Sequence, residues 1–136
     1  MQQQAATREV VNPWSWQDQF GFVHANVLRD GHRIAYCAGQ ASVDADGRPV
    51  HEGNMAAQIQ QALANLESVL ADSGMALSDV VRLNYYVTDV DAFLGAGPTL
   101  GTLLATAGCR PASTLLGVAR LAFPEFLIEL EATAAT

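Results

Sequence analysis

The chain contains no lysine, and all seven of its cationic side chains are arginine. Schiff-base chemistry, including that of pyridoxal phosphate, needs a lysine amine, and the phosphate-binding P-loop also requires a lysine. These kinds of site are therefore excluded. The formal net charge of −7 at pH 7 argues against nucleic acid or an anionic membrane as a partner, because their phosphates bind clustered cations.

Long hydrophobic runs are absent as well, although half of the residues are hydrophobic. The apolar runs fall far short of the roughly 20 residues that cross a bilayer, and residues 1–14 lack the basic and apolar regions of a signal peptide. We therefore expect a cytoplasmic protein. Its two cysteines, Cys37 and Cys109, lie in apolar surroundings and are expected to be buried, reduced thiols.

The metal-binding motifs are incomplete. The His51-Glu52 pair lacks the second histidine of a zinc helix, and residues 44–47 open like a calcium loop but lack its later ligands. The sequence therefore predicts no metal site, and we expect no cofactor.

The length of 136 residues fits a single domain, which we place at residues 13–136, after a flexible N-terminal segment of residues 1–12. An Asp30-Gly31 turn between two apolar runs predicts a β-hairpin. Glycines and Pro98 inside the second helix predict a break near that proline. Alternation and helical periodicity predict strands over 19–28, 33–39, 80–88, 112–120 and 126–134, and helices over 53–73 and 91–107.

The stretch from Val80 to Ala119 has the order strand, helix, strand, which predicts a parallel pair with a right-handed crossover. With the hairpin, this predicts a two-layer α+β domain, in which one mixed β-sheet has two helices packed on one face. The other face would be bare, so Phe20, Phe22 and Tyr86 would need cover. A homo-oligomer would supply that cover.

The last predicted strand alternates between apolar and acidic residues. Glu129 and Glu131 share one face, and the apolar side chains from Phe126 to Ala132 occupy the other. Two carboxylates opposite an apolar face either meet water or line a site.

The C-terminal quarter of the chain resembles the Rid family, the reactive intermediate deaminases or YjgF-like proteins, which end in a phrase of the type PARS…VEIEAIA. Gly39-Gln40 and the segment 87–90 (VTDV) fit the same family. The resemblance implies a chorismate-mutase-like fold, a homotrimer and a small-molecule pocket at each subunit junction. The matching C-terminal segments are 111–114 (PAST), 118–121 (VARL) and 128–132 (IELEA).

The resemblance also implies site residues. It makes Glu129 the catalytic carboxylate and Ala38 and Gly39 part of the substrate-binding turn. Ser113 stands where deaminating members carry the arginine that holds the substrate carboxylate, and Phe22 stands where they carry a tyrosine. A serine hydroxyl cannot replace a guanidinium fork, so affinity for a small 2-imino acid should fall by about one to two orders of magnitude. A neutral or cationic ligand would suit the pocket better.

Three further residues are candidates for the same pocket. His24 shares a strand face with Phe22 and could transfer protons, although a packed or surface histidine is the alternative. Thr114 would add a ligand-binding hydroxyl beside Ser113. Arg110 could act as a displaced anchor for the substrate.

Two functions compete at this point. The first is an enzyme that hydrolyses, deaminates or tautomerises an enamine or imine other than a simple 2-imino acid, with Glu129 and His24 in acid and base roles. The alternative is a non-catalytic homotrimer that binds a metabolite or a partner protein. Retention of Glu129 favours the enzyme, and loss of the polar pocket groups favours the binding protein.

Overall fold

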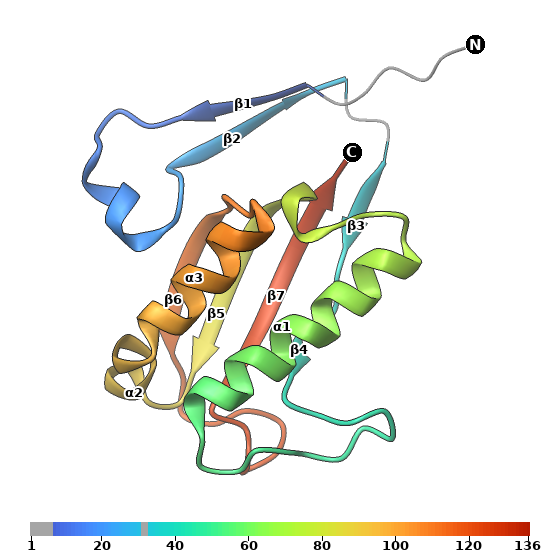
Figure 1. The fold of residues 1–136 in the computed structure, drawn as a ribbon, viewed down its shortest axis with the longest axis vertical. Helices are drawn as coiled ribbons and strands as arrows, with labels where there is room; N and C mark the ends of the chain where they lie inside the picture. The colour runs from blue at the N-terminus through green and yellow to red at the C-terminus, as the bar shows by residue number, and fades with distance from the viewer. Residues whose placement is uncertain (1–6, 31–32) are drawn as a thin grey trace.

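The computed structural model describes residues 7–30 and 33–136. Its main sheet has the strand order β3-β7-β5-β6, with β4 also paired to β7, and the helices lie across one face of it (Figure 1). This is the expected α+β, two-layer arrangement. The sheet strands are β3 (Ile34–Tyr36), β4 (Gln40–Ala41), β5 (Val80–Val87), β6 (Ala112–Gly117) and β7 (Ile128–Ala135), and the helices are α1 (Met55–Asp72), α2 (Val90–Gly95) and α3 (Gly97–Ala107).

The predicted β-α-β unit forms one side of the sheet, with β5 inside and β6 at the edge. Strand β5 pairs parallel with β6 and antiparallel with β7, and α2 and α3 form the connection. Alternate side chains of β5 and β7 are buried, as the period of two predicts. The fully buried Leu83, Ile128 and Leu130 share the core with Ile59 and Leu66 of α1.

The first long helix follows the prediction closely. The side chain of Asn54 accepts a hydrogen bond from the backbone N–H of Ala57 at 3.0 Å and so caps α1. Beyond the other end, Gly74 has φ +75°, a left-handed conformation that glycine adopts without a steric cost.

The second predicted helix is broken, as expected. Helix α2 is capped by Asp89 and begins at Val90, one residue before the start of the predicted helix over 91–107. It ends at Gly95, and α3 begins at Gly97 with Pro98 in its first turn. A proline costs nothing there because the first helical N–H groups have no partner within the helix. The proline therefore starts a helix rather than kinking one.

The N-terminal third differs from the prediction. Residues 16–20 form a short 3-10 helix, η1 (Trp16–Phe20), and the strand predicted over 19–28 is the shorter β2 (Ala25–Arg29). Strand β2 pairs antiparallel with β1 (Thr7–Val11) and not with β3, so the predicted hairpin across Asp30-Gly31 is wrong. Gly31 itself lies outside the described residues. The alternation over 19–28 corresponds to a strand only from residue 25 onward, where β1 supplies a partner.

Arg8 attaches this N-terminal hairpin to the main sheet. Its guanidinium donates to the backbone oxygens of Ser78 at 3.0 Å, Val80 at 3.3 Å and Arg110 at 2.6 Å, and to Asn26 Oδ1 at 2.9 Å. Residues 7–11 are thus an anchored strand, which corrects the expectation of a flexible segment over 1–12. Residues 1–6 lie outside the described residues.

In the described part of the chain, the helices leave one face of the main sheet open (Figure 1). Ile34, Tyr36 and Leu116 project from this face and are respectively 50%, 81% and 49% exposed. None of the described helices is both long and apolar enough to cross a bilayer.

Candidate functional site

Glu129 lies on the open face of the sheet, near the beginning of β7. It is directly opposite Ala41 of β4 and Tyr86 of β5. Its carboxylate rests against the backbone of Gly39. A Cβ built on Gly39 would overlap Oε1 of Glu129 and lie 2.7 Å from its Cδ. The structure therefore brings together two of the residues that the resemblance assigned to one site.

Gln58 of α1 fixes the entry into β7. This side chain is fully buried, and its Oε1 accepts a hydrogen bond from the backbone N–H of Leu127 at 2.8 Å. Its Nε2 donates to the carbonyl oxygens of Glu125 at 2.9 Å and His51 at 3.1 Å. Because Leu127 lies two residues before Glu129, these bonds hold the start of the strand that carries the carboxylate. Gln58 lies on the polar side of the helix pattern, so the sequence alone predicts a solvated side chain and gives no signal of this role.

The second carboxylate of β7 is already engaged. Oε1 of Glu131 accepts hydrogen bonds from the Tyr86 hydroxyl at 2.8 Å and from Asn84 Nδ2 at 3.2 Å. The bond from Tyr86, followed by that from Asn84, lowers the pKa of Glu131, and the same contact raises the pKa of Tyr86. Among the described residues, no hydrogen bond or ion pair reaches the carboxylate of Glu129. Glu129 is thus the carboxylate free to interact with a ligand.

Ser113 lies away from Glu129 in the single chain. Ser113 pairs with the core residue Leu83, so its side chain points toward the helices, whereas Glu129 lies in the row of Tyr86 on the open face. Three strand positions, about 10 Å, separate the two rows. The Ser113 hydroxyl is buried and has no hydrogen-bond partner among the described residues. Thr114 lies on the open face, where its hydroxyl accepts a hydrogen bond from Arg82 at 2.9 Å.

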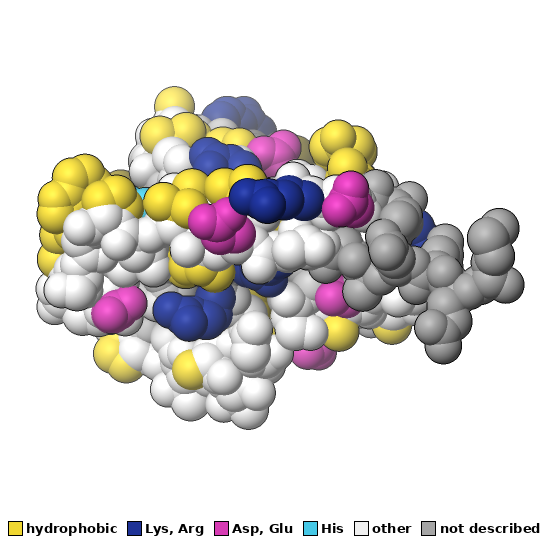
Figure 2. All heavy atoms as spheres, turned by 90° about the horizontal axis from the view of Figure 1, so that it is seen from above, with side chains coloured by type: hydrophobic (Ala, Val, Ile, Leu, Met, Phe, Trp, Pro, Cys, Tyr) yellow, Lys and Arg dark blue, Asp and Glu magenta, His cyan; other side chains and the backbone are white. Residues whose placement is uncertain are grey.

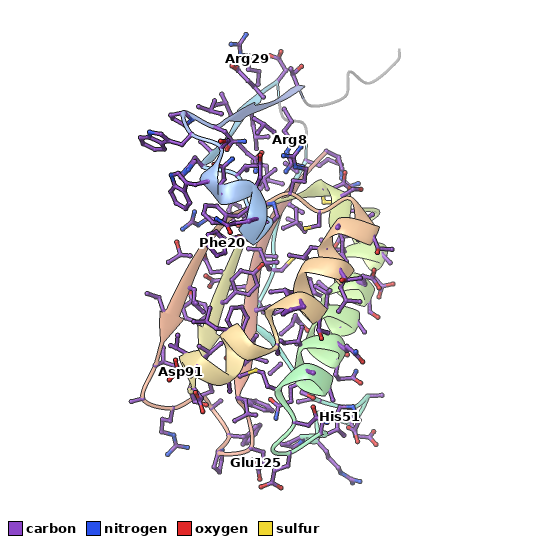
Figure 3. All side chains as sticks on the ribbon, turned by 60° about the vertical axis from the view of Figure 1, so that its left-hand side comes forward. Arg8, Phe20, Arg29, His51, Asp91 and Glu125 are labelled. Carbon is purple, nitrogen blue, oxygen red and sulfur yellow. The ribbon has the colours of Figure 1, made fainter. Side chains whose placement is uncertain are left out.

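Phe22 and His24 lie at the other end of β6. Val23 between them forms a parallel bridge with Ala112, and its N–H donates to the carbonyl of Pro111 at 3.0 Å. Ala112 is four strand positions, about 13 Å, from the row of Glu129. Figure 3 shows that η1, with Phe20, also lies well away from the Glu125 corner that precedes β7. In a single chain, Glu129 and Gly39 therefore form a first group of candidates, and Ser113, Phe22 and His24 form a second group.

The remaining candidates lie at the surface. Arg110 is exposed, and its carbonyl oxygen accepts hydrogen bonds from Arg8 and Asn26. Ala38 is exposed beside Gly39, and its carbonyl accepts a bond from the side chain of Gln40 at 3.1 Å. The described residues hold no group of three or more histidine, cysteine or acidic side chains arranged for a metal ion.

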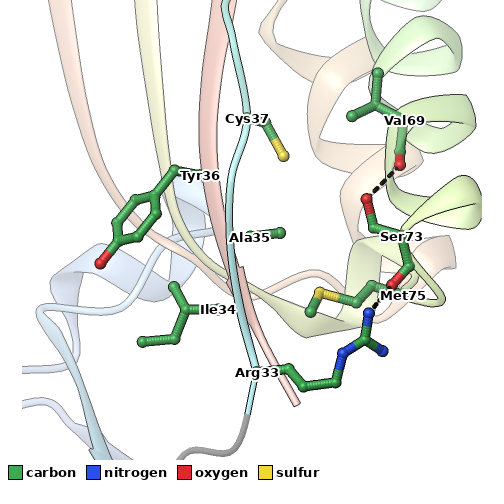
Figure 4. Close-up of a pocket in the computed structure, with 8 residues that line it drawn as sticks. All are labelled: Arg33, Ile34, Ala35, Tyr36, Cys37, Val69, Ser73 and Met75. Carbon is green, nitrogen blue, oxygen red and sulfur yellow. Dashed lines mark hydrogen bonds between the residues drawn. The ribbon is translucent and has the colours of Figure 1, made fainter.

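An open depression that the sequence did not suggest lies between β3 and the end of α1 (Figure 4). Arg33 crosses it and donates to the carbonyl of Ser73 at 2.6 Å. Cys37 and Met75 line its apolar side, and burial raises the pKa of the Cys37 thiol. Arg33 and Ser73 are 40 residues apart in sequence, so only the folded chain reveals their contact.

Comparison with known proteins points to one family. The family model described as endoribonuclease L-PSP matches residues 21–136. The RutC family protein PYRAB12510 of Pyrococcus abyssi is 27% identical over 111 residues, which are 82% of this chain and 84% of that protein. The mitochondrial protein mmf1 of Schizosaccharomyces pombe is 38% identical over 60 residues, and the match spans 44% of this chain and only 36% of that longer protein.

Solved structures agree with this result. YyfB of Yersinia pestis, a protein of unknown function of the Rid family, superposes with a TM-score of 0.85 at 38% identity, over 95% of this chain and 98% of that one. YjgF of E. coli superposes with a TM-score of 0.68 at 26% identity, over 76% and 81% of the two chains.

Proposed function

Because the chain belongs to the Rid or YjgF-like family, also described as endoribonuclease L-PSP, we propose that it acts on an enamine or imine. The substrate is not a simple 2-imino acid. The reaction is hydrolysis with release of ammonia, or tautomerisation of the enamine to the imine, and Glu129 is the acid and base.

One observation carries this proposal: Glu129 is a half-buried carboxylate that rests on Gly39 without any hydrogen-bond donor among the described residues. In hydrolysis of an imine, the carboxylate takes a proton from water as the oxygen adds to the C=N carbon. It then returns this proton to the nitrogen, which gives a carbinolamine. The carboxylate next transfers the hydroxyl proton of the carbinolamine to the nitrogen, so that the C–N bond breaks and ammonia leaves a carbonyl product. General acid and base catalysis of this kind needs a carboxylate that is not held by another group.

The polarity of the chain supports a neutral or cationic substrate. An arginine that pairs with a carboxylate contributes a bidentate, charge-assisted contact, and Ser113 offers none. Glu129 and Glu131 place two carboxylates on the same sheet face. A substrate with its own carboxylate would meet repulsion there.

A second copy of the chain completes the pocket in this proposal. Within one chain, Glu129 and Gly39 are separated from Ser113, Phe22 and His24 by about 10 to 13 Å along the sheet. An oligomer, which we propose to be a homotrimer, brings the first group of one copy against the second group of its neighbour. It also covers the open sheet face. The proposed compartment is the cytoplasm, although relatives from two yeasts are named as mitochondrial.

The test is ammonia release from freshly generated 2-aminoacrylate and from uncharged enamines. We expect turnover of the uncharged enamines and little of 2-aminoacrylate. Glu129→Gln should abolish turnover, whereas Glu131→Gln, which alters a carboxylate already bound by Tyr86 and Asn84, is the matched control. Sedimentation should give three times the 14.4 kDa mass of one chain. No release from any substrate would favour the non-catalytic binding homotrimer instead.

A further inference from the structure

A group of aromatic side chains surrounds His24 at the N-terminal end of the molecule. We call Trp14, Trp16 and Phe22 the aromatic cluster. Their ring centroids lie 5.1, 4.9 and 5.6 Å from that of His24, each edge to face. Trp14 and Trp16 are 60% and 51% exposed. Figure 2 shows hydrophobic side chains gathered at an edge of the molecule.

Four buried side-chain polar atoms lack a hydrogen-bond partner among the described residues: Gln17 Oε1, Asn84 Oδ1, His24 Nε2 and Ser113 Oγ. His24 Nε2 and Ser113 Oγ are inaccessible to solvent, and neither has a hydrogen-bond partner among residues 7–30 and 33–136. Buried polar side-chain atoms are nearly always hydrogen-bonded, so two such atoms call for an explanation.

The two atoms come from neighbouring positions. Val23 and Ala112 form an isolated parallel bridge, and the residues that follow them are His24, in a bend before β2, and Ser113, in β6. Tyr85 lies close to Ser113, since the Ser113 hydroxyl affects the pKa of Tyr85, which burial raises. No hydrogen bond of acceptable geometry joins Ser113 to Tyr85.

The chemistry of the pair defines what it can bind. A serine hydroxyl can donate to a carbonyl oxygen, and the neutral imidazole can accept a hydrogen bond at Nε2 from an N–H group. A primary amide, or a carbonyl conjugated to an enamine, presents both groups in one plane. Ser113 carries no charge, so it offers a carboxylate no ion pair of the kind that an arginine would form.

We propose that Ser113 and His24 bind the amide-like end of an uncharged, planar ligand whose ring lies against Trp14 and Trp16. This inference rests on the proposed function, because it names the class of substrate that Glu129 of a neighbouring copy would act on. Access requires an indole ring to move. Both indoles are more than half exposed, and Gln17 is the only buried side chain of η1, so few contacts oppose that movement.

Tryptophan fluorescence tests this proposal directly, because Trp14 and Trp16 are the only tryptophans of the chain. The probe is nicotinamide, a planar amide without charge. We expect saturable quenching by nicotinamide, and binding at least tenfold weaker for nicotinate, which is charged, and for cyclohexanecarboxamide, which is not planar. Equal binding of all three compounds would overturn the proposal.

Two variants locate the probe. Ser113→Ala and His24→Phe should each weaken nicotinamide binding at least fivefold, whereas Ser68→Ala, on the exposed face of α1, should leave it unchanged. If His24→Phe does not fold, Ser113→Ala alone decides. Unchanged affinity in Ser113→Ala would mean that only a buried water bridges the two atoms, and the proposal would be wrong.

Glu129→Gln separates this inference from the proposed enzyme activity. Nicotinamide should bind to Glu129→Gln as it does to the parent protein, because the carboxylate contributes nothing to this contact. Turnover of an enamine without any nicotinamide binding would overturn the ligand class alone. Nicotinamide binding without turnover of any enamine would uphold the ligand class and overturn the enzyme.

Discussion

The carboxylate of Glu129 occupies the space that a side chain at Gly39 would fill. A Cβ at Gly39 would lie 2.7 Å from Glu129 Cδ and 3.0 Å from its Cγ. The backbone of Gly39 does not have the positive φ that favours glycine, so the close approach alone accounts for the residue. The turn before β4 thus leaves open the space that the Glu129 side chain of β7 occupies.

Gly39→Ala should therefore push the Glu129 side chain out of its place. We expect at least a tenfold loss of ammonia release from an uncharged enamine, with a stability loss of about 1–2 kcal/mol, since overpacking costs this much where the neighbour is a flexible side chain. Urea unfolding and steady-state kinetics measure the two effects. Full activity in Gly39→Ala would show that the position of the carboxylate does not matter.

Gly101→Ala is the matched glycine control. Gly101 lies exposed within α3, and a Cβ there would meet no atom within 4 Å. Alanine favours a helix over glycine by about 1 kcal/mol, so this variant should be slightly more stable than the parent and equally active. A loss of activity here would mean that glycine replacements act on the protein in general.

Glu131→Gln should lower the pKa of Tyr86. The pKa of Tyr86 is raised chiefly because its hydroxyl donates to the Glu131 carboxylate, and ionisation would lose this bond. The stabilisation is present below the ordinary tyrosine pKa and is lost as the pH rises through the raised value. Ultraviolet titration of tyrosinate measures the shift, and Tyr86→Phe identifies which of the three tyrosines is responsible. Identical curves for the parent and Glu131→Gln would contradict it.

Arg8→Ala should loosen the N-terminal hairpin. Arg8 is partly buried and makes four hydrogen bonds, three of them to backbone oxygens of the main domain. Removing a charged donor from several acceptors should cost about 2–4 kcal/mol. Arg29→Ala is the control and should cost less than about 1 kcal/mol, because its ion pair with Glu9, at 3.5 Å, is exposed. Equal unfolding midpoints for the two variants would exclude the anchor.

Both thiols should resist alkylation in the folded protein. Burial raises the pKa of Cys109 to about 11, and it raises that of Cys37 as well. At pH 8 only a small fraction of such thiols is ionised, and the thiolate is the reactive form. We expect slow reaction with Ellman's reagent, faster for Cys37 beside the depression of Figure 4, and rapid reaction of both in urea. Native rates equal to those in urea would refute this.

Local sequence patterns predicted correctly those helices and strands whose structure depends mainly on their own residues. Helix α1 and the strands β5 and β7 were confirmed because their periodic faces are long and unambiguous. The hairpin across Asp30-Gly31 failed because the sequence pattern predicts no strand over residues 1–12, whereas packing pairs β2 with β1. Arg8 carried no sequence signal, since three of its four partners are 70 to 102 residues away along the chain.

The same division holds for the candidate site. The alternation in the last strand determined that Glu129 and Glu131 share a face, because a strand has a period of two. Only the tertiary structure decided that Glu131 is bound by Tyr86 while Glu129 is free against Gly39. It also placed Ser113 beside His24 rather than beside Glu129. Such contacts depend on the register between strands, which the sequence of one strand does not contain.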